Sequence, residues 1–216
     1  MDQLSFASLD YATKKKRTKR EVFLAEMAAV VPWAKLEAVI EPHYPKTGPL
    51  GGRRPFPLPV MLRIYCLQQW YGLSDPGAEE ALYDIHSMRA FAGLELGRDA
   101  IPDETTILNF RHLLERHDLT KAIFAAVAEH LEARGEMLRG GTIVDATLIA
   151  ASPSTKNKEG KRDPQMRSSK KGNQWYFGMK AHVGVDAKSG LVHTAGVTTG
   201  SVHDAKVMYR LIREER

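Results

Sequence analysis

The spacing of the apolar residues changes once along this chain, near Gly140 and Gly141, and this change constrains the fold more than any other feature. Before it, apolar side chains recur every three or four residues, which predicts amphipathic helices. After it, residues 142–149 form a short β-branched run that is typical of a buried strand. We therefore expect an α+β protein in which an all-helical domain precedes a domain built on a sheet.

Capping residues divide the first region into separate helices. The start signals are Thr18 with Glu21, Ser74, Asp103 and Thr120, and the stop signals are Gly72 and Gly135. Between them, Tyr65, Trp70 and Tyr71 share a helical spacing, so we expect them in the core. Residues 21–140 are thus predicted to form a helical bundle.

The second region, residues 141–216, has the element order strand, polar loop, strand, strand, helix. Its first strand carries one acid, Asp145, in an otherwise apolar run. Residues 175–185 and 191–199 have strand composition and are joined by a turn-like segment, so they predict a hairpin. Asp204 lies at the start of the last amphipathic segment, where it can cap a helix.

Basic residues gather in two segments. The expected loop at 152–174 holds seven Lys or Arg residues against two acids, which accounts for the net charge of +5 of the whole chain. Six more basic residues lie between Lys14 and Arg20, in an N-terminal segment, residues 1–20, that we expect to be flexible. Such patches favour binding to a polyanion, and the alternative is that they only keep the protein soluble.

Apolar residues are numerous enough for a packed core, yet nowhere continuous enough for a membrane span. They make up 43% of the chain, and no run approaches the ~20 residues that a spanning helix needs. The basic run before Val22 imitates a signal peptide, but Glu21 and Glu26 interrupt its apolar part. The single cysteine, Cys66, excludes an intrachain disulfide and a cysteine-based zinc site. We expect a cytoplasmic protein that does not enter a membrane.

Several motifs taken together are more specific than the order of the elements. They are Tyr71-Gly72-Leu73-Ser74-Asp75, Ser87-Met88-Arg89-Ala90-Phe91, Ile101-Pro102-Asp103-Glu104-Thr105-Thr106-Ile107, Val144-Asp145-Ala146-Thr147, Trp175-Tyr176-Phe177-Gly178-Met179-Lys180-Ala181-His182 and Val202-His203-Asp204. From about residue 20 to the C-terminus, the sequence resembles the insertion-sequence-five group of bacterial DDE transposases.

The resemblance implies a helical DNA-binding domain at 21–140, followed at 141–216 by the first half, β-β-β-α, of a ribonuclease H-like domain. It also implies that the protein binds the terminal inverted repeats of its element and cuts and joins DNA strands. In this family, three carboxylates hold two Mg²⁺ ions that carry the phosphodiester chemistry. The implied partners are double-stranded DNA, both inverted repeats and target, and further copies of the chain in a homo-oligomer on DNA.

Asp145 matches the first of the three acids, so the resemblance assigns it as a catalytic metal ligand. An acid in an apolar strand is costly to bury unless it is paired or binds a metal, which agrees with this role. The alternative is an Asp that caps a turn at the end of a strand. The motifs that carry the second Asp and the Glu are not present, so we expect a truncated chain with those acids beyond it.

Other residues are expected to support the site or to contact DNA. Asp204 either caps its helix or, with His203, supports the metal site. The predicted DNA contacts are Lys156, Lys158, Lys161, Arg162, Lys170, Lys171, Trp175 and Lys180. Arg89 and Arg111 either contact DNA or brace the helices, and we expect bracing. The histidines of the second region lack the close spacing of a zinc site.

Three functions compete at this point. The first is a transposase, and the second is a truncated, non-catalytic DNA-binding protein that inhibits the element or is a remnant of it. A plain RNA-binding helical protein is the third, but it leaves the Asp145 strand and the motif at 175–182 unexplained. The DNA that follows the codon for Arg216 would separate the first two, because an Asp-Gly-Tyr motif in another frame would indicate frameshifting or decay.

Overall fold

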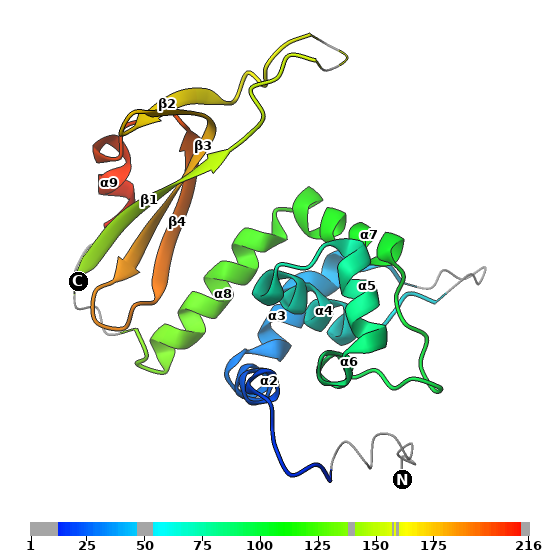
Figure 1. The fold of residues 1–216 in the computed structure, drawn as a ribbon. Helices are drawn as coiled ribbons and strands as arrows, with labels where there is room; N and C mark the ends of the chain where they lie inside the picture. The colour runs from blue at the N-terminus through cyan, green and yellow to red at the C-terminus, as the bar shows by residue number, and fades with distance from the viewer. Residues whose placement is uncertain (1–12, 47–53, 138–140, 157, 159, 213–216) are drawn as a thin grey trace. The chain divides into compact units, whose positions relative to one another are not determined.

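The computed structural model describes residues 13–46, 54–137, 141–156, 158 and 160–212. These residues form two compact units, which divide between Val127 and Ala128 (Figure 1). Helices build the first unit and the second contains a sheet, so the predicted α+β class is confirmed. No helix in the described part of the chain is both long and apolar enough to cross a membrane.

The first unit is built from helices that pack on one another. They are α2 (Lys19–Val30), α3 (Trp33–Ile40), the 3-10 helix η1 (Glu41–His43), α4 (Leu58–Tyr71), α5 (Asp75–Asp84), α6 (His86–Ala92), α7 (Glu104–Arg116) and α8 (Leu119–Ala133), which runs through the boundary between the units.

Local capping explains where several of these helices begin and end. The Thr18 hydroxyl accepts from the Glu21 amide, and the Glu21 carboxylate accepts from the Thr18 amide, so the predicted capping box forms. Ser74 and Asp103 each accept from the backbone amide three residues later, as predicted. Gly72 ends α4 in the left-handed conformation, with a φ of +63°. Each side-chain cap of this kind stabilises its helix by about 1 kcal/mol.

One hydrophobic cluster joins the helices of this unit. Its centre consists of leucines that are at most 1% exposed: Leu36 on α3, Leu62 on α4, Leu82 on α5 and Leu114 on α7. The predicted core residues Tyr65, Trp70 and Tyr71 pack against the cluster. Trp70 meets Phe23 edge to face, with 5.4 Å between ring centroids, in the geometry that aromatic pairs prefer.

Two features of this unit differ from the prediction. Residues 86–92 form a separate short helix, α6, that the sequence did not indicate, because Ile85 precedes it and has no side chain that can cap a helix. Helix α8 begins at Leu119, so Thr120 lies inside it rather than at its cap. Asp118, just before α8, has a φ of +52° and turns the chain away from α7.

The sheet of the second unit is centred on β3 (Gln174–Asp186). It pairs antiparallel with β1 (Thr142–Ala150), β2 (Arg167–Lys171) and β4 (Val192–Thr199), and α9 (Ala205–Leu211) follows β4. The predicted hairpin of β3 and β4 is therefore confirmed. The register places Asp145 opposite Val183 and Ala146 opposite His182.

The segment expected to be a basic loop, residues 152–174, contains the strand β2. A two-residue connection, Gly172 and Asn173, joins β2 to β3. Gly172 has a φ of +60°, which a tight hairpin turn needs at this position. The strand reads RSSKK and has no apolar alternation, so backbone pairing with β3 forms it rather than burial of side chains. The observed order is β-β-β-β-α, one strand more than predicted.

Helix α9 covers one face of the sheet. It contacts β1, β3 and β4, and Gly184 allows its close approach, since a Cβ there would lie 2.5 Å from the Leu211 carbonyl oxygen. On the opposite face, Ile143, Ile149 and Val197 are 56%, 50% and 59% exposed. The two faces therefore offer different surroundings to the polar residues of the sheet.

Candidate functional site

Asp145 lies on the open face of the sheet. The residues of β1 alternate in exposure, and Asp145 shares its face with Ile143 and Ile149. Its carboxylate accepts a hydrogen bond of 2.8 Å from the Ala146 amide, and the side chain is exposed. The expectation of a buried acid is wrong, because α9 covers only the other face. A carboxylate in this position is accessible to a ligand that approaches from solvent.

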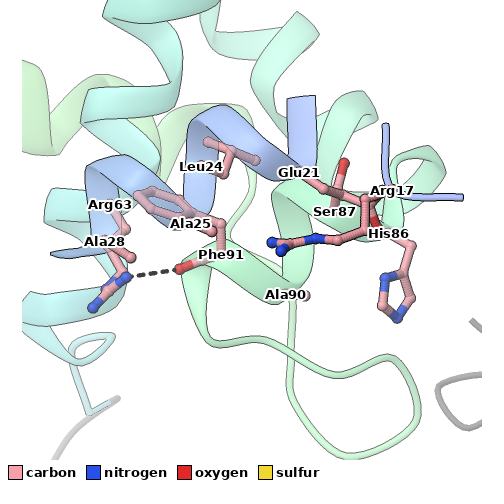
Figure 2. A pocket seen from close by; sticks show the side chains of 10 residues that line it. All are labelled: Arg17, Glu21, Leu24, Ala25, Ala28, Arg63, His86, Ser87, Ala90 and Phe91. Atoms are coloured by element: carbon pink, nitrogen blue, oxygen red, sulfur yellow. Dashed lines mark hydrogen bonds between the residues drawn. The ribbon is translucent and has the colours of Figure 1, made fainter. Parts of the chain in front are cut away.

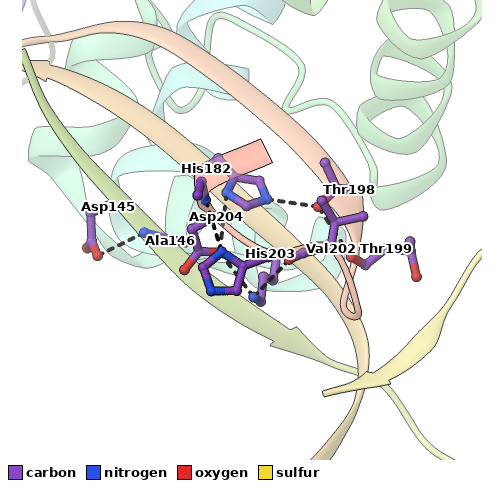
Figure 3. Close-up of polar contacts among 10 residues, drawn as sticks. Asp145, Ala146, His182, Thr198, Thr199, Val202, His203 and Asp204 are labelled. Carbon is purple, nitrogen blue, oxygen red and sulfur yellow. Dashed lines mark hydrogen bonds and ion pairs between the residues drawn. The ribbon is translucent and has the colours of Figure 1, made fainter. Parts of the chain in front are cut away.

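A polar cluster lies on the opposite face, beneath α9 (Figure 3). The Lys180 ammonium donates to the Asp204 carboxylate and to the Val202 carbonyl, both at 3.0 Å. Next to it, His182 is 0% exposed, and its Nε2 lies 2.8 Å from the Thr198 hydroxyl oxygen. The cluster ties the segment that leads into α9 to the centre of the sheet.

Hydrogen bonding determines the protonated nitrogen of His182. The Thr198 hydroxyl donates to the Thr199 carbonyl at 3.2 Å, so it accepts from the Nε2–H of His182. The other ring nitrogen, Nδ1, is buried and has no hydrogen-bond partner among the described residues. It lies 3.9 Å from the Asp204 carboxylate, which is too far for a hydrogen bond.

The structure does not bring Asp204 together with Asp145. Asp204 is the residue that precedes α9, but its side chain makes no capping bond and pairs with Lys180 instead. His203 contributes to the turn, because its Nδ1 accepts from the Ala205 amide at 3.2 Å. Since neighbouring strand residues alternate between faces, Asp145 and the Asp204 cluster lie on opposite faces of the sheet. No group of three or more His, Cys, Asp or Glu residues in the described ranges could hold a metal ion.

Most of the predicted DNA contacts lie on exposed positions of the second unit. The exposed residues are Lys156, Lys158, Lys161, Arg162, Lys170, Lys171 and Trp175. The register of the β2–β3 hairpin places Lys170 directly opposite Trp175, which is 67% exposed. The structure therefore pairs one cation with one large aromatic ring on the same face of this hairpin.

Lys180 differs from the other residues of that set. Its side chain is 15% exposed, and Asp204 neutralises its charge, so it has an internal role in this structure. Sequence analysis missed this pair. A signal was present, since Lys180 and His182 are two residues apart on one strand and so share the face that an amphipathic helix is expected to cover.

In the helical unit, the two arginines that were expected to brace the bundle do so. The Arg111 guanidinium makes two hydrogen bonds of 2.8 Å to the Asp75 carboxylate, and Gln68 donates to the same carboxylate at 2.8 Å. The hydrogen bonds from Arg111 hold the pKa of Asp75 below its usual range. Arg89 donates to the carbonyl oxygens of Leu82 and Tyr83, which end α5. These bonds connect α4, α5, α6 and α7.

Comparison with known families identifies the family of this chain. A family model described as a transposase domain (DUF772) matches residues 12–113, and one described as a transposase DDE domain matches residues 136–216. The chain belongs to the DDE family of insertion-sequence transposases. No solved structure matches it.

Membership places the polar residues of this transposase in context. The family consists of enzymes that act on DNA during transposition and generally depend on divalent metal ions. Asp145 lies on β1, within the part matched by the DDE domain model, and the bracing residues Asp75 and Arg111 lie within the part matched by the other model. The resemblance seen in the sequence is thus confirmed at the level of the family.

Proposed function

We propose that this transposase belongs to the insertion-sequence-five group and binds the terminal inverted repeats of its element. In this proposal, residues 21–140 read the DNA sequence, and the basic residues between Lys14 and Arg20 add contacts to the backbone of the DNA. Lys19 and Arg20 begin helix α2, and residues 1–12 of the segment that we expected to be flexible lie outside the described residues. Residues 141–216 form part of a ribonuclease H-like catalytic domain. The match of two transposase models to the two regions supports this division of roles. In the same proposal, the protein acts in the cytoplasm, and several copies of the chain bind the DNA together as a homo-oligomer.

The hairpin of β2 and β3 supports DNA contact by the second unit. Lysine ammonium groups attract phosphates with little regard to sequence, and an exposed aromatic ring can stack on a base or sugar. Lys170 and Trp175, opposite each other, offer both contacts at one place. The exposed residues Lys156, Lys158, Lys161 and Arg162 add charge in the segment before the hairpin. Lys180 is not part of this proposed surface, because Asp204 neutralises it.

The proposed catalytic role of this chain rests on the position and exposure of Asp145. It is the acid of the first strand in the region matched by the DDE model, and it is exposed to solvent. Mg²⁺ prefers carboxylate oxygen ligands, so Asp145 would hold a metal ion that activates the attacking oxygen or stabilises the leaving one. A site for two ions needs further acids. The described residues do not supply them on this face, so they do not make a two-ion site by themselves.

We therefore propose that this 216-residue chain does not cut or join DNA strands alone. The specific observation is that Asp204, the other acid weighed as a supporting ligand, lies on the opposite face and is paired with Lys180. The second candidate function follows from the same observation. A chain that binds inverted repeats without cutting them would occupy the ends of the element and inhibit transposition.

A mobility-shift series with the full chain tests DNA recognition. We expect tighter binding to a duplex that carries the inverted repeat of the element than to a scrambled duplex at moderate salt. Changing Lys156, Lys158, Lys161 and Arg162 to Gln should weaken binding to both duplexes equally and reduce the dependence on salt. Equal affinity of the unchanged chain for both duplexes would contradict recognition of the repeats.

A cleavage assay tests the catalytic part. We expect no nicking of a labelled inverted-repeat duplex when the chain is incubated with Mg²⁺ or Mn²⁺. Metal-dependent nicking that is lost in Asp145→Asn would show that this chain completes a site by itself, and it would restore Asp204 as a candidate ligand. Nicking that persists in Asp145→Asn would remove Asp145 from the site.

A further inference from the structure

A cavity in the helical unit has the chemistry of an anion site. It has a volume of about 350 Å³ and lies between α2 with the residues before it, α4 and α6 (Figure 2). The cavity is shallow and open to solvent, so it can receive a group that projects from a larger molecule. The residues that matter here are Arg17, Glu21, Arg63, His86, Ser87 and Phe91.

Arg63 is a positioned cation in the wall of this cavity. Its guanidinium lies 4.5 Å from the centre of the Trp33 ring and 5.1 Å from that of Phe91, and it donates to the Phe91 carbonyl at 3.2 Å. These contacts hold the side chain in place and use only part of its five N–H donors. Among the described residues, no carboxylate forms an ion pair with it. The remaining donors are available to an anion.

The surrounding charges leave the cavity positive. Arg17 is a second cation on the wall and is exposed. Glu21 is the acid there, but Lys14 pairs with it, and it also accepts from the Thr18 amide. Burial lowers the pKa of His86, so its imidazole is neutral at pH 7 and adds no charge. With the charge of Glu21 balanced, no carboxylate among the described residues forms an ion pair with Arg17 or Arg63.

We propose that this cavity binds a phosphate group of the DNA backbone. Arg63 and Arg17 would bind the phosphate oxygens, because the planar guanidinium suits two-point contact with phosphate. Ser87 is a buried residue that also lines the cavity, and its hydroxyl is a further donor there. The basic run 14–20 extends the positive charge beyond the cavity, to positions that a single nucleotide would not reach. DNA, which carries a row of phosphates, is therefore favoured over a free nucleotide.

The inference rests on the proposed DNA binding, and the experiment separates the two. The full chain and the variants Arg17→Gln, Arg63→Gln and Lys35→Gln are titrated with inverted-repeat duplex over a range of salt. Lys35 is an exposed cation on α3 that does not line the cavity, so its variant is the matched control. We expect each arginine variant to lower affinity about tenfold at moderate salt, and the salt exponent to fall by about one. The control should change affinity less than twofold.

Neutralising single phosphates on the DNA shows whether the contact is direct. Methylphosphonate substitution at the contacted position should weaken binding of the unchanged chain and of Lys35→Gln. The same substitution should weaken Arg17→Gln or Arg63→Gln less than it weakens the unchanged chain, because one arginine remains in each variant, and it should have no further effect on the double variant. In Glu21→Gln, the wall loses its acid, so we expect affinity to rise. Arg17 is exposed, so its variant carries the test if Arg63→Gln fails to fold.

Each outcome decides one of the two proposals. If the unchanged chain binds no DNA, the proposed function fails and this inference falls with it. If the chain binds DNA but both arginine variants match Lys35→Gln, only the phosphate site is wrong. If a mononucleotide binds the unchanged chain at micromolar concentration and Arg63→Gln loses that binding, while no single phosphate position in the duplex matters, the cavity serves a free nucleotide and the assignment to DNA is overturned.

Discussion

The two units of this transposase bury their apolar residues to different extents. In the helical unit, one cluster joins residues from α2 to α8, and its central leucines are at most 1% exposed. In the sheet unit, α9 covers one face with the buried residues Val207 and Leu211, while three large apolar residues of the other face remain half exposed. The helical unit thus completes its own core, whereas the sheet unit depends on one short helix and on polar contacts beneath it.

The difference follows from how each element presents its apolar side chains. Amphipathic helices can turn every apolar stripe toward a common centre, so the bundle closes on itself. A sheet has two faces, and a single helix of seven residues covers only one of them. We therefore expect stability to be sensitive to core substitutions in the first unit and to backbone fit in the second. Four predictions test this comparison, from the largest expected effect to the smallest.

Truncating a core leucine should separate the two units most clearly. Leu114 is 0% exposed, so Leu114→Ala should lower the free energy of unfolding by about 3 kcal/mol through lost burial and a cavity. Ile149→Ala, at a position 50% exposed, should cost less than about 1 kcal/mol. Urea unfolding followed by circular dichroism measures both. Equal losses would mean that the sheet unit has a closed core as well.

Backbone fit in the sheet is tested by a pair of glycines. A Cβ at Gly178 would lie 2.0 Å from the Ile149 carbonyl oxygen, so Gly178→Ala should push β1 from β3 and cost about 2–3 kcal/mol. A Cβ at Gly196 on β4 would meet no described residue within 4 Å, so Gly196→Ala should change the free energy of unfolding by no more than about 1 kcal/mol. Hydrogen exchange of β3 amides reports the loss of pairing. Faster exchange in both variants would show that the sheet is loose rather than tightly fitted.

Acid should weaken the helical unit through Asp75. Because Arg111 lowers the pKa of Asp75 in the folded state, the pair stabilises the unit above the unfolded pKa of about 3.9, and this contribution is lost as pH falls through the folded pKa. Asp75→Asn should cost about 1 kcal/mol at pH 7, a modest value since Arg111 is partly exposed. The variant should also lose less stability than the unchanged chain below pH 4.

The control for that experiment is Asp118→Asn, which removes an exposed ion pair with Lys121. Thermal unfolding is measured for all three proteins between pH 7 and pH 2. An acid response of Asp75→Asn that matches the unchanged chain would contradict the assigned role of the pair.

The smallest effects concern the two faces of the sheet. Asp145 is exposed, and within the described ranges it bonds only to the neighbouring Ala146 amide, so Asp145→Asn should change the free energy of unfolding by less than about 0.5 kcal/mol. Asp204→Asn weakens the pair with Lys180 and should cost about 0.5–1 kcal/mol. Thermal unfolding of the two variants measures the difference. A larger loss in Asp145→Asn would place that acid in a structural network instead of at an open ligand position.

Much of the helical unit could be predicted from the sequence because its signals are local. The caps at Thr18, Ser74 and Asp103 each involve a side chain and an amide three residues later, and Gly72 ends a helix through its own backbone conformation. The motif around Asp145 likewise belongs to one stretch of chain, and together with the other local motifs it is sufficient to indicate a transposase. These features depend on residues that are neighbours in the sequence.

Tertiary structure alone decided the features that depend on distant partners. The strand β2 forms because its backbone pairs with that of β3. Helix α6 has no capping side chain from which its start could be predicted. The alternation of β1 predicts two faces, but only the packing of α9 decides which of them is covered and that Asp145 lies on the open one. In the same way, Lys180 looks like a free cation in the sequence, and the fold brings Asp204 to it across 24 residues of chain. Local propensity carries no information on such pairs, because burial and charge neutralisation are decided only when separate segments pack together.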